Sequence, residues 1–247
     1  MIFNLFKTKP TLKELIPEGF VDIHSHILPG IDDGAKNIKE SVMLAIEMKK
    51  LGFSSLITTP HSYPGLYDNN NISIKASYEK VKNPINKLNI KFNYASEYLI
   101  HNSIINKAEK GELLTIKNNY LLVEMSFLSA PMNLYEILYK IQMNGYIPIL
   151  AHPERYSFLF NRFSEYKNLK NRGCLFQLNL LSSTGYYGEK ISKISEKLLK
   201  ENLIDFVGSD IHNINQIRAM HSKLIISSSK KLIEAVNKTQ EIFSRLD

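Results

Sequence analysis

Seven short β-like runs alternate with longer amphipathic stretches along most of the chain. The runs cover residues 20–26, 53–60, 90–97, 120–126, 146–152, 174–180 and 203–210. Helix-like stretches at 39–52 and 133–145 both end in Gly, which commonly stops a helix. Strands that alternate with helices favour a parallel sheet. Because there are seven such units without a break in composition, we expect an α/β fold that closes, or nearly closes, into a barrel.

The length of the chain suits a single domain. With 247 residues it can bury one large core, and α/β barrels of this size are often one domain. We therefore expect one domain over residues 1–247, with residues 1–19 as a possible N-terminal extension. A loop is expected at 67–73, a linker at 227–231 and a last helix over roughly 230–244.

Composition excludes several classes of protein. No apolar run approaches the ~20 residues of a membrane-spanning helix, and the first residues lack the apolar core of a signal peptide. The lone cysteine, Cys174, rules out an internal disulfide and favours a cytoplasmic location. The formal net charge is +7, but the lysines are scattered, which indicates solvated helix faces rather than a nucleic-acid surface.

Two histidines end the first predicted strand. Asp22, His24 and His26 alternate along it and therefore share one face, which is a poor surface for core packing. Catalytic groups of α/β barrels gather at the C-terminal ends of the strands. Other candidates lie at or near such ends, or in the loop after His26: Asp32 or Asp33, His61, Glu97, Glu124, His152, Asp210 and His212.

These residues offer five imidazoles and four carboxylates, if one loop aspartate takes part. Mixed nitrogen and oxygen donors without thiolate suit manganese, iron or zinc. Nine donors are too many for one ion and suit about two or three, which would also relieve repulsion among the carboxylates. Such a site activates water near neutral pH and binds both oxygens of a phosphoryl transfer. Arg155 adds a planar cation suited to phosphate, so the residues indicate hydrolysis of a phosphate ester.

The motifs that carry these residues resemble those of a known superfamily. They are "DIHSHILPGIDDG", "TTPHSYPG", "SEY", "LVEMS", "AHPERY" and "GSDIH", spread over about residues 20–213. They resemble the PHP (polymerase and histidinol phosphatase) superfamily, and within it the bacterial capsule-biosynthesis protein-tyrosine phosphatases of the CpsB/YwqE kind. The resemblance implies a distorted (β/α)7 barrel and a manganese-favouring, three-metal hydrolase that acts on phosphotyrosine through metal-activated hydroxide, without a cysteine nucleophile. It also implies a partner, the tyrosine-rich tail of a membrane-bound bacterial tyrosine kinase that controls capsule or exopolysaccharide synthesis.

The resemblance also implies roles for individual residues. One ion would be bound by His24, His26, Glu97 and Asp210, a second by Glu97, Glu124 and His152, and a third by Asp33, His61 and His212. Arg155 would bind the phosphate, and Arg155, Asp210 and Glu124 are the catalytic candidates. The division of ligands among the ions and the choice between Asp32 and Asp33 stay open.

Several residues are expected to lie outside this chemistry. Cysteine-dependent tyrosine phosphatases carry an arginine six positions after the nucleophile, but Leu180 stands there after Cys174, whose apolar strand predicts an inert buried thiol. We expect Asp22 to lie behind the ligands and orient an imidazole. Spectator roles are expected for His101 and His221. Tyr63 and the tyrosines of residues 186–188 are candidates for lining a pocket for an aromatic ring, but tyrosines are common in this chain, so spectator roles are expected for them too.

Two alternative functions remain open at this point. A small-molecule phosphoesterase such as histidinol-phosphate phosphatase would use the same metals, although the wording of "HSHILPGIDDG" and "AHPER" favours a protein phosphatase. A non-catalytic metal-binding interaction module is disfavoured, because the ligand residues and Arg155 are all present.

Overall fold

The strands of this protein form two parallel sheets that together make a ring. The structure is a computed structural model that describes residues 9–244. The smaller sheet has the order β1 (Phe20–Asp22), β2 (Phe53–Thr58), β4 (Lys91–Tyr94). The larger has the order β3 (His61–Ser62), β5 (Glu97–Leu99), β6 (Tyr120–Glu124), β7 (Ile147–Ala151), β8 (Leu175–Asn179), β9 (Phe206–Gly208). Every strand pair within the two sheets is parallel.

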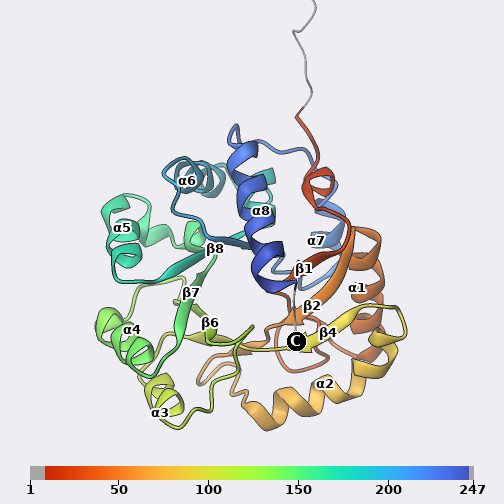
Figure 1. The fold of residues 1–247 in the computed structure, drawn as a ribbon, viewed down its shortest axis with the longest axis horizontal. Helices are drawn as coiled ribbons and strands as arrows, with labels where there is room; N and C mark the ends of the chain where they lie inside the picture. Colours follow the sequence, from red (N-terminus) through yellow and green to blue (C-terminus); the bar gives the residue numbers. More distant parts are fainter. Residues whose placement is uncertain (1–8, 245–247) are drawn as a thin grey trace, which may run out of the picture.

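The ring closes between the first and last strands. A parallel bridge joins Ser25, just after β1, to Ile211, just after β9. On the other side the chain crosses twice from the smaller sheet to the larger, between β2 and β3 and between β4 and β5. Helices surround the strands (Figure 1). The expected α/β fold, a distorted barrel of seven strand-and-helix units, is confirmed.

One predicted strand is in fact two. Residues 90–97 were expected to form a single strand that ends at Glu97, but β4 ends at Tyr94 and Glu97 begins β5. The reason is the change of sheet, in which the amide of Glu97 donates to the carbonyl of Pro60 at 3.1 Å. Because His61 likewise begins β3 and pairs in register with Glu97, the two side chains start adjacent strands.

The helices lie between successive strand units, with two after β9. They are α1 (Ile38–Lys50), α2 (Asn71–Asn86), α3 (Ser103–Glu109), α4 (Leu134–Met143), α5 (Phe163–Asn171), α6 (Glu189–Lys200), α7 (Ile214–Ala219) and α8 (Ser229–Phe243). The three helices expected from sequence, α1, α4 and α8, are confirmed to within two residues at each end. The expected loop at 67–73 and linker at 227–231 are partly wrong, because Asn70 caps α2 through its side chain and α8 begins at Ser229.

Aromatic side chains close the N-terminal end of the barrel. Phe243 of α8 packs edge-on against Phe206 at 5.0 Å and against Tyr120 at 5.4 Å, where β9 and β6 begin. The side chain of Gln240 accepts a hydrogen bond from the amide of Val21 in β1. Because α8 covers this end, the polar residues that follow the strands gather at the opposite end.

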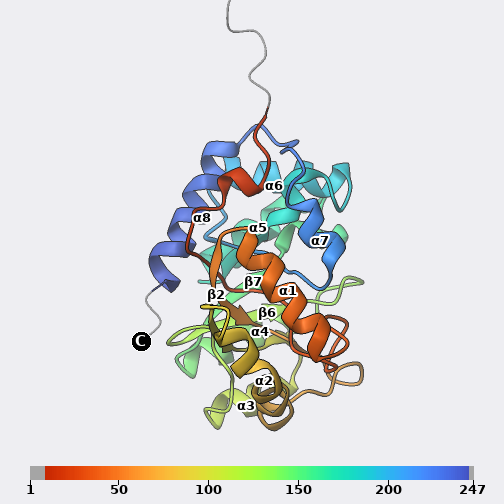
Figure 2. The ribbon, with the colours of Figure 1, turned by 90° about the vertical axis from the view of Figure 1, so that its right-hand side faces the viewer.

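The described part of the expected N-terminal extension packs against the barrel. Leu12 is fully buried, and its amide donates to the carbonyl of Ser222 at 3.0 Å. Figure 2 shows this segment beside α7 and α8. Residues 1–8 lie outside the described residues, and one domain over 1–247 stays a prediction. Among residues 9–244, no helix is both long enough and apolar enough to cross a membrane.

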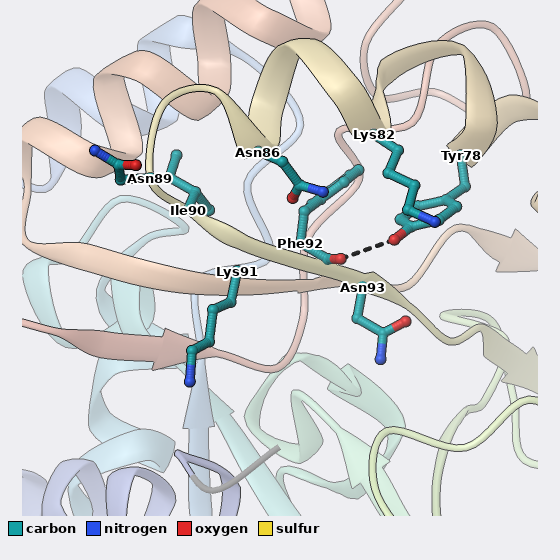
Figure 3. A pocket seen from close by; sticks show the side chains of 8 residues that line it. All are labelled: Tyr78, Lys82, Asn86, Asn89, Ile90, Lys91, Phe92 and Asn93. Atoms are coloured by element: carbon teal, nitrogen blue, oxygen red, sulfur yellow. Dashed lines mark hydrogen bonds between the residues drawn. The ribbon is translucent and has the colours of Figure 1, made fainter. Parts of the chain in front are cut away.

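A pocket of about 660 Å³ lies where β4 begins (Figure 3). It is lined by Tyr78, Lys82, Asn86 and residues 89–93, and the hydroxyl of Tyr78 donates to the carbonyl of Phe92 at 2.9 Å. The metal-ligand candidates follow the opposite ends of the strands, so this pocket is separate from them.

The loop after β1 folds back on His26. The amide of Ala35 donates to the carbonyl of His26 at 3.0 Å, and the amide of Gly30 donates to the carbonyl of Ala35 at 2.7 Å. A Cβ atom at Gly34 would lie 1.8 Å from the carbonyl oxygen of His26. Only glycine therefore fits at the end of the Asp-Asp-Gly sequence without moving the backbone of His26.

Gly34→Ala should destabilise the protein, because backbone rather than a flexible side chain blocks the added methyl group. We expect the free energy of unfolding to fall by about 1–3 kcal/mol or more, as overpacking usually costs. Urea unfolding in the presence of chelator measures this without a contribution from metal. Lys36→Ala, at an exposed position of the same loop, is the control, and equal urea midpoints for the two variants would contradict the close approach at Gly34.

Candidate metal centre

The closure of the barrel brings the first and last histidine motifs together. The amide of Asp210 donates to the carbonyl of His24 at 2.7 Å, and the amide of His26 donates to the carbonyl of Ile211 at 2.9 Å. The Nε2 atoms of His24 and His26 lie 3.1 Å apart, and both side chains are fully buried. The two histidines therefore point to one place, as their spacing predicted.

Four donor atoms surround this place. The Nε2 atom of His24 lies 3.3 Å from Glu97 Oε2 and 3.3 Å from Asp210 Oδ1. The corresponding distances from His26 Nε2 are both 3.4 Å. Atoms that bind one ion at 2.0–2.2 Å lie roughly 3–4 Å apart. The atoms of His24, His26 and Glu97 therefore fit a single ion, and Asp210 forms a neighbouring group with His24 and His152.

Glu97 extends the cluster toward two more strands. Its Oε1 atom lies 3.0 Å from Nε2 of His152, and its Oε2 atom lies 3.1 Å from Nδ1 of His61. The same His61 nitrogen lies 2.8 Å from Oε1 of Glu124. Within residues 9–244, Oε2 of Glu97 is buried and accepts no hydrogen bond. A buried carboxylate oxygen needs a hydrogen bond or a cation, so a cation shared between neighbouring clusters fits this atom.

A third group lies at the edge of the site. The Oδ1 atom of Asp33 lies 3.5 Å from Nε2 of His61 and 3.4 Å from Nε2 of His212. The side chain of Asp33 is 52 % exposed, in contrast to the buried residues above. Together with His26, these donors lie within 4.8 Å of one another, which suits an ion reached from solvent.

The two loop aspartates differ in their contacts. Asp32 is fully engaged, since Oδ2 lies 2.9 Å from Nδ1 of His26 and accepts the amide of His61, while Oδ1 accepts the amide of Gly34. Asp33 instead faces two imidazole nitrogens. These contacts favour Asp33 as the ligand and Asp32 as the residue that orients His26.

Two candidate ligands have a strained backbone. His152 has φ 37° and Asp210 has φ 52°, in the left-handed region. The other non-glycine residues with positive φ in the described part of the chain are Asn89, Asn118 and Asn202. Strain of this kind costs about 1–3 kcal/mol per residue and is found mainly at functional sites.

The orientation of the imidazoles depends on residues that the sequence analysis missed or assigned differently. Nδ1 of His24 lies 2.7 Å from Oε1 of Gln177, a buried residue of β8 that was not predicted to take part. Nδ1 of His212 lies 2.9 Å from the carbonyl of Asp210. Metal-binding histidines usually bond the second nitrogen in this way.

The expected role of Asp22 is wrong. Its Oδ1 and Oδ2 atoms accept hydrogen bonds from the amide and hydroxyl of Ser209 at 2.9 and 2.6 Å. Its side chain makes no hydrogen bond to an imidazole among the described residues. Asp22 therefore positions the residue before Asp210 rather than a histidine, because the fold pairs the ends of β1 and β9.

The carboxylates and imidazoles shift one another's pKa values. Burial acts to raise the pKa of Glu97, but the neighbouring His24 and His61 lower it well below the usual range. The pKa of Asp210 is also well below its usual range, because His24 and His212 lower it against the effect of burial. Burial acts to lower the pKa of His26, but Asp32 and other acidic neighbours raise it well above its usual value. The centre is therefore a place where carboxylates require positive charge.

For Glu124 and His152, burial outweighs the neighbouring charges of opposite sign, so their pKa values shift toward the neutral form. Burial raises the pKa of Glu124 to about 7, and the charge of Glu97 adds to this. Burial lowers the pKa of His152 to about 4, against the effect of Glu97. A neutral imidazole is the form that binds metal, so His152 is prepared for a ligand role.

Arg155 lies beside the centre, on the turn Pro153–Arg155 after β7. Its Nη1 atom donates to Oδ2 of Asp210 at 2.8 Å. Its guanidinium carbon lies 4.8 Å from the ring centre of Phe127 and 4.4 Å from that of Tyr187. Tyr187, expected to be a spectator, thus belongs to the site, and Phe127 was missed although it stands three residues after Glu124.

The remaining spectators lie away from the centre. Cys174 is buried just before β8, and burial raises the pKa of its thiol to about 12. His101 and His221 are exposed and belong to none of the clusters. Tyr63 lines a separate small pocket, but its neighbour Tyr67 stacks on His61 with ring centres 5.5 Å apart. Tyr67 was not predicted.

The geometry describes a multinuclear metal centre at one end of a barrel, and comparison with known proteins identifies its family. The model of the family "Capsular polysaccharide synthesis, CpsB/CapC" matches residues 20–244. The chain is 31% identical over 206 residues to the tyrosine-protein phosphatase YwqE of Bacillus subtilis, covering 82% of this chain and 81% of that protein. It is 34% identical over 197 residues to the putative tyrosine-protein phosphatase CapC of Staphylococcus aureus, covering 78% of this chain and 77% of that protein. The chain belongs to the CpsB/CapC family.

Solved structures agree with this assignment. One from the work on YwqE of Bacillus subtilis and CpsB of Streptococcus pneumoniae, described as unique metal-dependent tyrosine phosphatases, superposes with TM-score 0.75 and 28% identity. It covers 91% of this chain and 87% of the other. An amidohydrolase from Mycoplasma synoviae superposes with TM-score 0.54 and 12% identity, covering 98% of this chain and 93% of the other. This similarity shows a shared fold alone.

Gln177→Leu should weaken metal binding, because it keeps the bulk of the side chain and removes the acceptor for His24. Loss of such a partner typically costs about 10- to 100-fold in metal affinity. Gln177→Glu keeps a hydrogen-bond acceptor for His24, so its metal affinity should be closer to that of the wild type. Competition with a fluorescent chelator during manganese titration measures the affinity, and an unchanged affinity for Gln177→Leu would show that His24 does not need this partner.

Proposed function

We propose that this chain is a metal-dependent protein-tyrosine phosphatase that hydrolyses phosphotyrosine without a cysteine nucleophile. One observation carries the proposal: nine candidate ligands and Arg155 converge at one end of the barrel in a member of the CpsB/CapC family. YwqE and CpsB are described as metal-dependent tyrosine phosphatases, and the relatives above carry the same activity in their names.

The proposed division of the ligands is the one that the family resemblance implies; by distance alone, His152 groups with His24 and Asp210, and Glu124 groups with His61 and Glu97. We assign His24, His26, Glu97 and Asp210 to one ion, Glu97, Glu124 and His152 to a second, and Asp33, His61 and His212 to a third. The contact of His61 Nδ1 with Glu97 and Glu124 ties the second group to the third. Manganese is the proposed metal, and iron or zinc would accept the same donors. When bound, such ions activate water and neutralise phosphate oxygens.

The chain's own residues bind and orient the phosphate. The guanidinium of Arg155 has five N–H donors, and its one side-chain hydrogen bond within residues 9–244 goes to Asp210, which leaves other donors for phosphate oxygens. Asp210 accepts this hydrogen bond on Oδ2, which also accepts Nδ2 of Asn179, and keeps Oδ1 toward His24 and His26. Asp210 therefore couples the phosphate-binding residue to the ligands. Glu124 bonds His61 and is the third residue that we assign to catalysis, with Arg155 and Asp210.

For the substrate we propose a phosphotyrosine-bearing protein, the tyrosine-rich tail of a membrane-bound bacterial tyrosine kinase. The name of the family, capsular polysaccharide synthesis, supports a role in the control of capsule or exopolysaccharide production. A substrate tail on the inner side of the membrane, together with the free thiol of Cys174, supports a cytoplasmic location.

Purified protein with manganese should release phosphate from a phosphotyrosine peptide, and chelator should abolish the activity until manganese is restored. Histidinol phosphate should be hydrolysed much more slowly. Cys174→Ala should act within about twofold of wild type, because a buried neutral thiol is no nucleophile. Faster hydrolysis of histidinol phosphate would indicate a small-molecule phosphoesterase, and loss of activity in folded Cys174→Ala would overturn the metal mechanism.

Arg155→Ala should lose most turnover on phosphotyrosine while it keeps its metal content, although the loss of the ion pair with the buried Asp210 should lower its melting temperature. Loss of one preorganised donor typically costs about 10²–10³ in rate. Arg155→Lys keeps the charge but not the planar fork, so it should recover only part of the activity. Turnover, metal analysis and melting temperature are measured on one preparation, and wild-type turnover in Arg155→Ala would remove Arg155 from the phosphate site.

A further inference from the structure

Arg155 lies against two aromatic rings from distant parts of the chain. Phe127 comes from the loop between β6 and α4, and Tyr187 from the segment just before α6. The guanidinium carbon lies 4.8 and 4.4 Å from the two ring centres. Cations over aromatic faces at such distances are attracted by the ring. The position of Arg155 thus depends on these rings as well as on its hydrogen bond to Asp210.

Tyr187 is the fixed side of this arrangement. Its hydroxyl accepts hydrogen bonds from Nδ2 of Asn179 and Nε2 of Gln216, both at 3.2 Å. Asn179 also donates to Oδ2 of Asp210, and Oε1 of Gln216 accepts the amide of His212 at 2.6 Å. The ring is therefore anchored to the same two residues that anchor the last metal-ligand motif.

Phe127 is the open side. Its ring stacks on that of His152, with centres 5.6 Å apart and planes 22° apart, and packs on Tyr156 at 5.7 Å. It nevertheless remains 44% exposed. Phe127 thus contacts both Arg155 and a candidate metal ligand, and part of its apolar ring faces solvent beside the proposed phosphate site.

We propose that Phe127 and Tyr187 form an aromatic clamp that positions Arg155, and that the exposed part of Phe127 receives the aromatic ring of the substrate. This rests on the proposed function. When Arg155 grips the phosphate of phosphotyrosine, the phenyl group is attached one oxygen away and must leave the site past the neighbouring surface. Aromatic rings stack favourably in offset or edge-on arrangements. Phe127 is then the residue that favours aryl over alkyl phosphates, and Tyr187 is a positioning residue.

The clamp is first tested on Arg155 itself, without metal or substrate. Phe127→Leu and Tyr187→Leu keep apolar bulk and remove the ring. Each should raise the rate at which phenylglyoxal modifies Arg155, followed by mass spectrometry, several-fold relative to Arg172 in the same sample. Arg172 lies over the ring of Tyr135, which neither variant changes. Leu128→Ala, at a position 89% exposed beside Phe127, should leave the rate unchanged. Equal Arg155 rates in the ring variants and wild type would overturn the clamp.

Selectivity is tested on the manganese-loaded enzyme. The ratio of kcat/KM for a phosphotyrosine peptide to that for the matched phosphoserine peptide should fall roughly tenfold in Phe127→Leu, mainly through KM, and return in Phe127→Tyr. An unchanged ratio would overturn the role of Phe127 in selection. If wild type hydrolyses neither peptide, the proposed function fails, and with it the selection of substrate, while the phenylglyoxal result still decides whether the rings hold Arg155.

Discussion

The buried charge of Glu97 is the constraint on which the rest of the site depends. Its side chain is fully buried, and Oε2 lies 3.1–3.4 Å from nitrogens of His24, His26 and His61. An isolated carboxylate in such surroundings costs several kcal/mol unless it is paired. Asp210 adds a second buried carboxylate beside His24 and His26. The imidazoles can balance this charge only by taking up protons, whereas divalent ions balance it and leave the imidazoles neutral as ligands.

The distorted barrel is what brings these charges together. A regular strand would carry His61 and Glu97 at its end, but here each begins a short second strand after the chain changes sheet, and the two pair in register. On the other side, the bridge between Ser25 and Ile211 closes the ring and joins the first and last histidine motifs. The two irregular features of the barrel therefore lie at the places where the ligands must converge, and an open sheet would separate them.

Much of the fold could be predicted from the sequence because apolar runs and helix stops are local signals. The parallel arrangement, the seven units and the end at which the ligands gather all follow from such signals, and a motif such as His-x-His marks its own strand face. The break of the predicted strand at 90–97 was not predictable, because it depends on hydrogen bonds to Thr58 at the end of β2 and to Pro60 just before β3.

Residues that act through contacts between strands could not be predicted from the sequence either. Gln177 looks like an ordinary residue of a buried strand until His24 is placed beside it. Phe127 and Tyr187 look like ordinary aromatic residues in the sequence, and only the structure shows that both contact Arg155. Asp22 was assigned to an imidazole because it shares a strand face with two, yet its carboxylate accepts hydrogen bonds from Ser209, just after β9. Spacing in sequence identifies chemistry, but partners across the barrel decide roles.

The two ends of the barrel have opposite requirements, and the fold separates them. At one end, strained backbone at His152 and Asp210 and buried carboxylates all oppose folding. At the other end, α8 packs Phe243 against Phe206 and Tyr120, and apolar residues such as Val21, Ile57, Leu122 and Ile149 fill the interior between. Burial of this apolar surface offsets the cost of the polar end. Because the stabilising contacts do not involve the ligands, the polar end is free to be shaped by the chemistry of metal and phosphate.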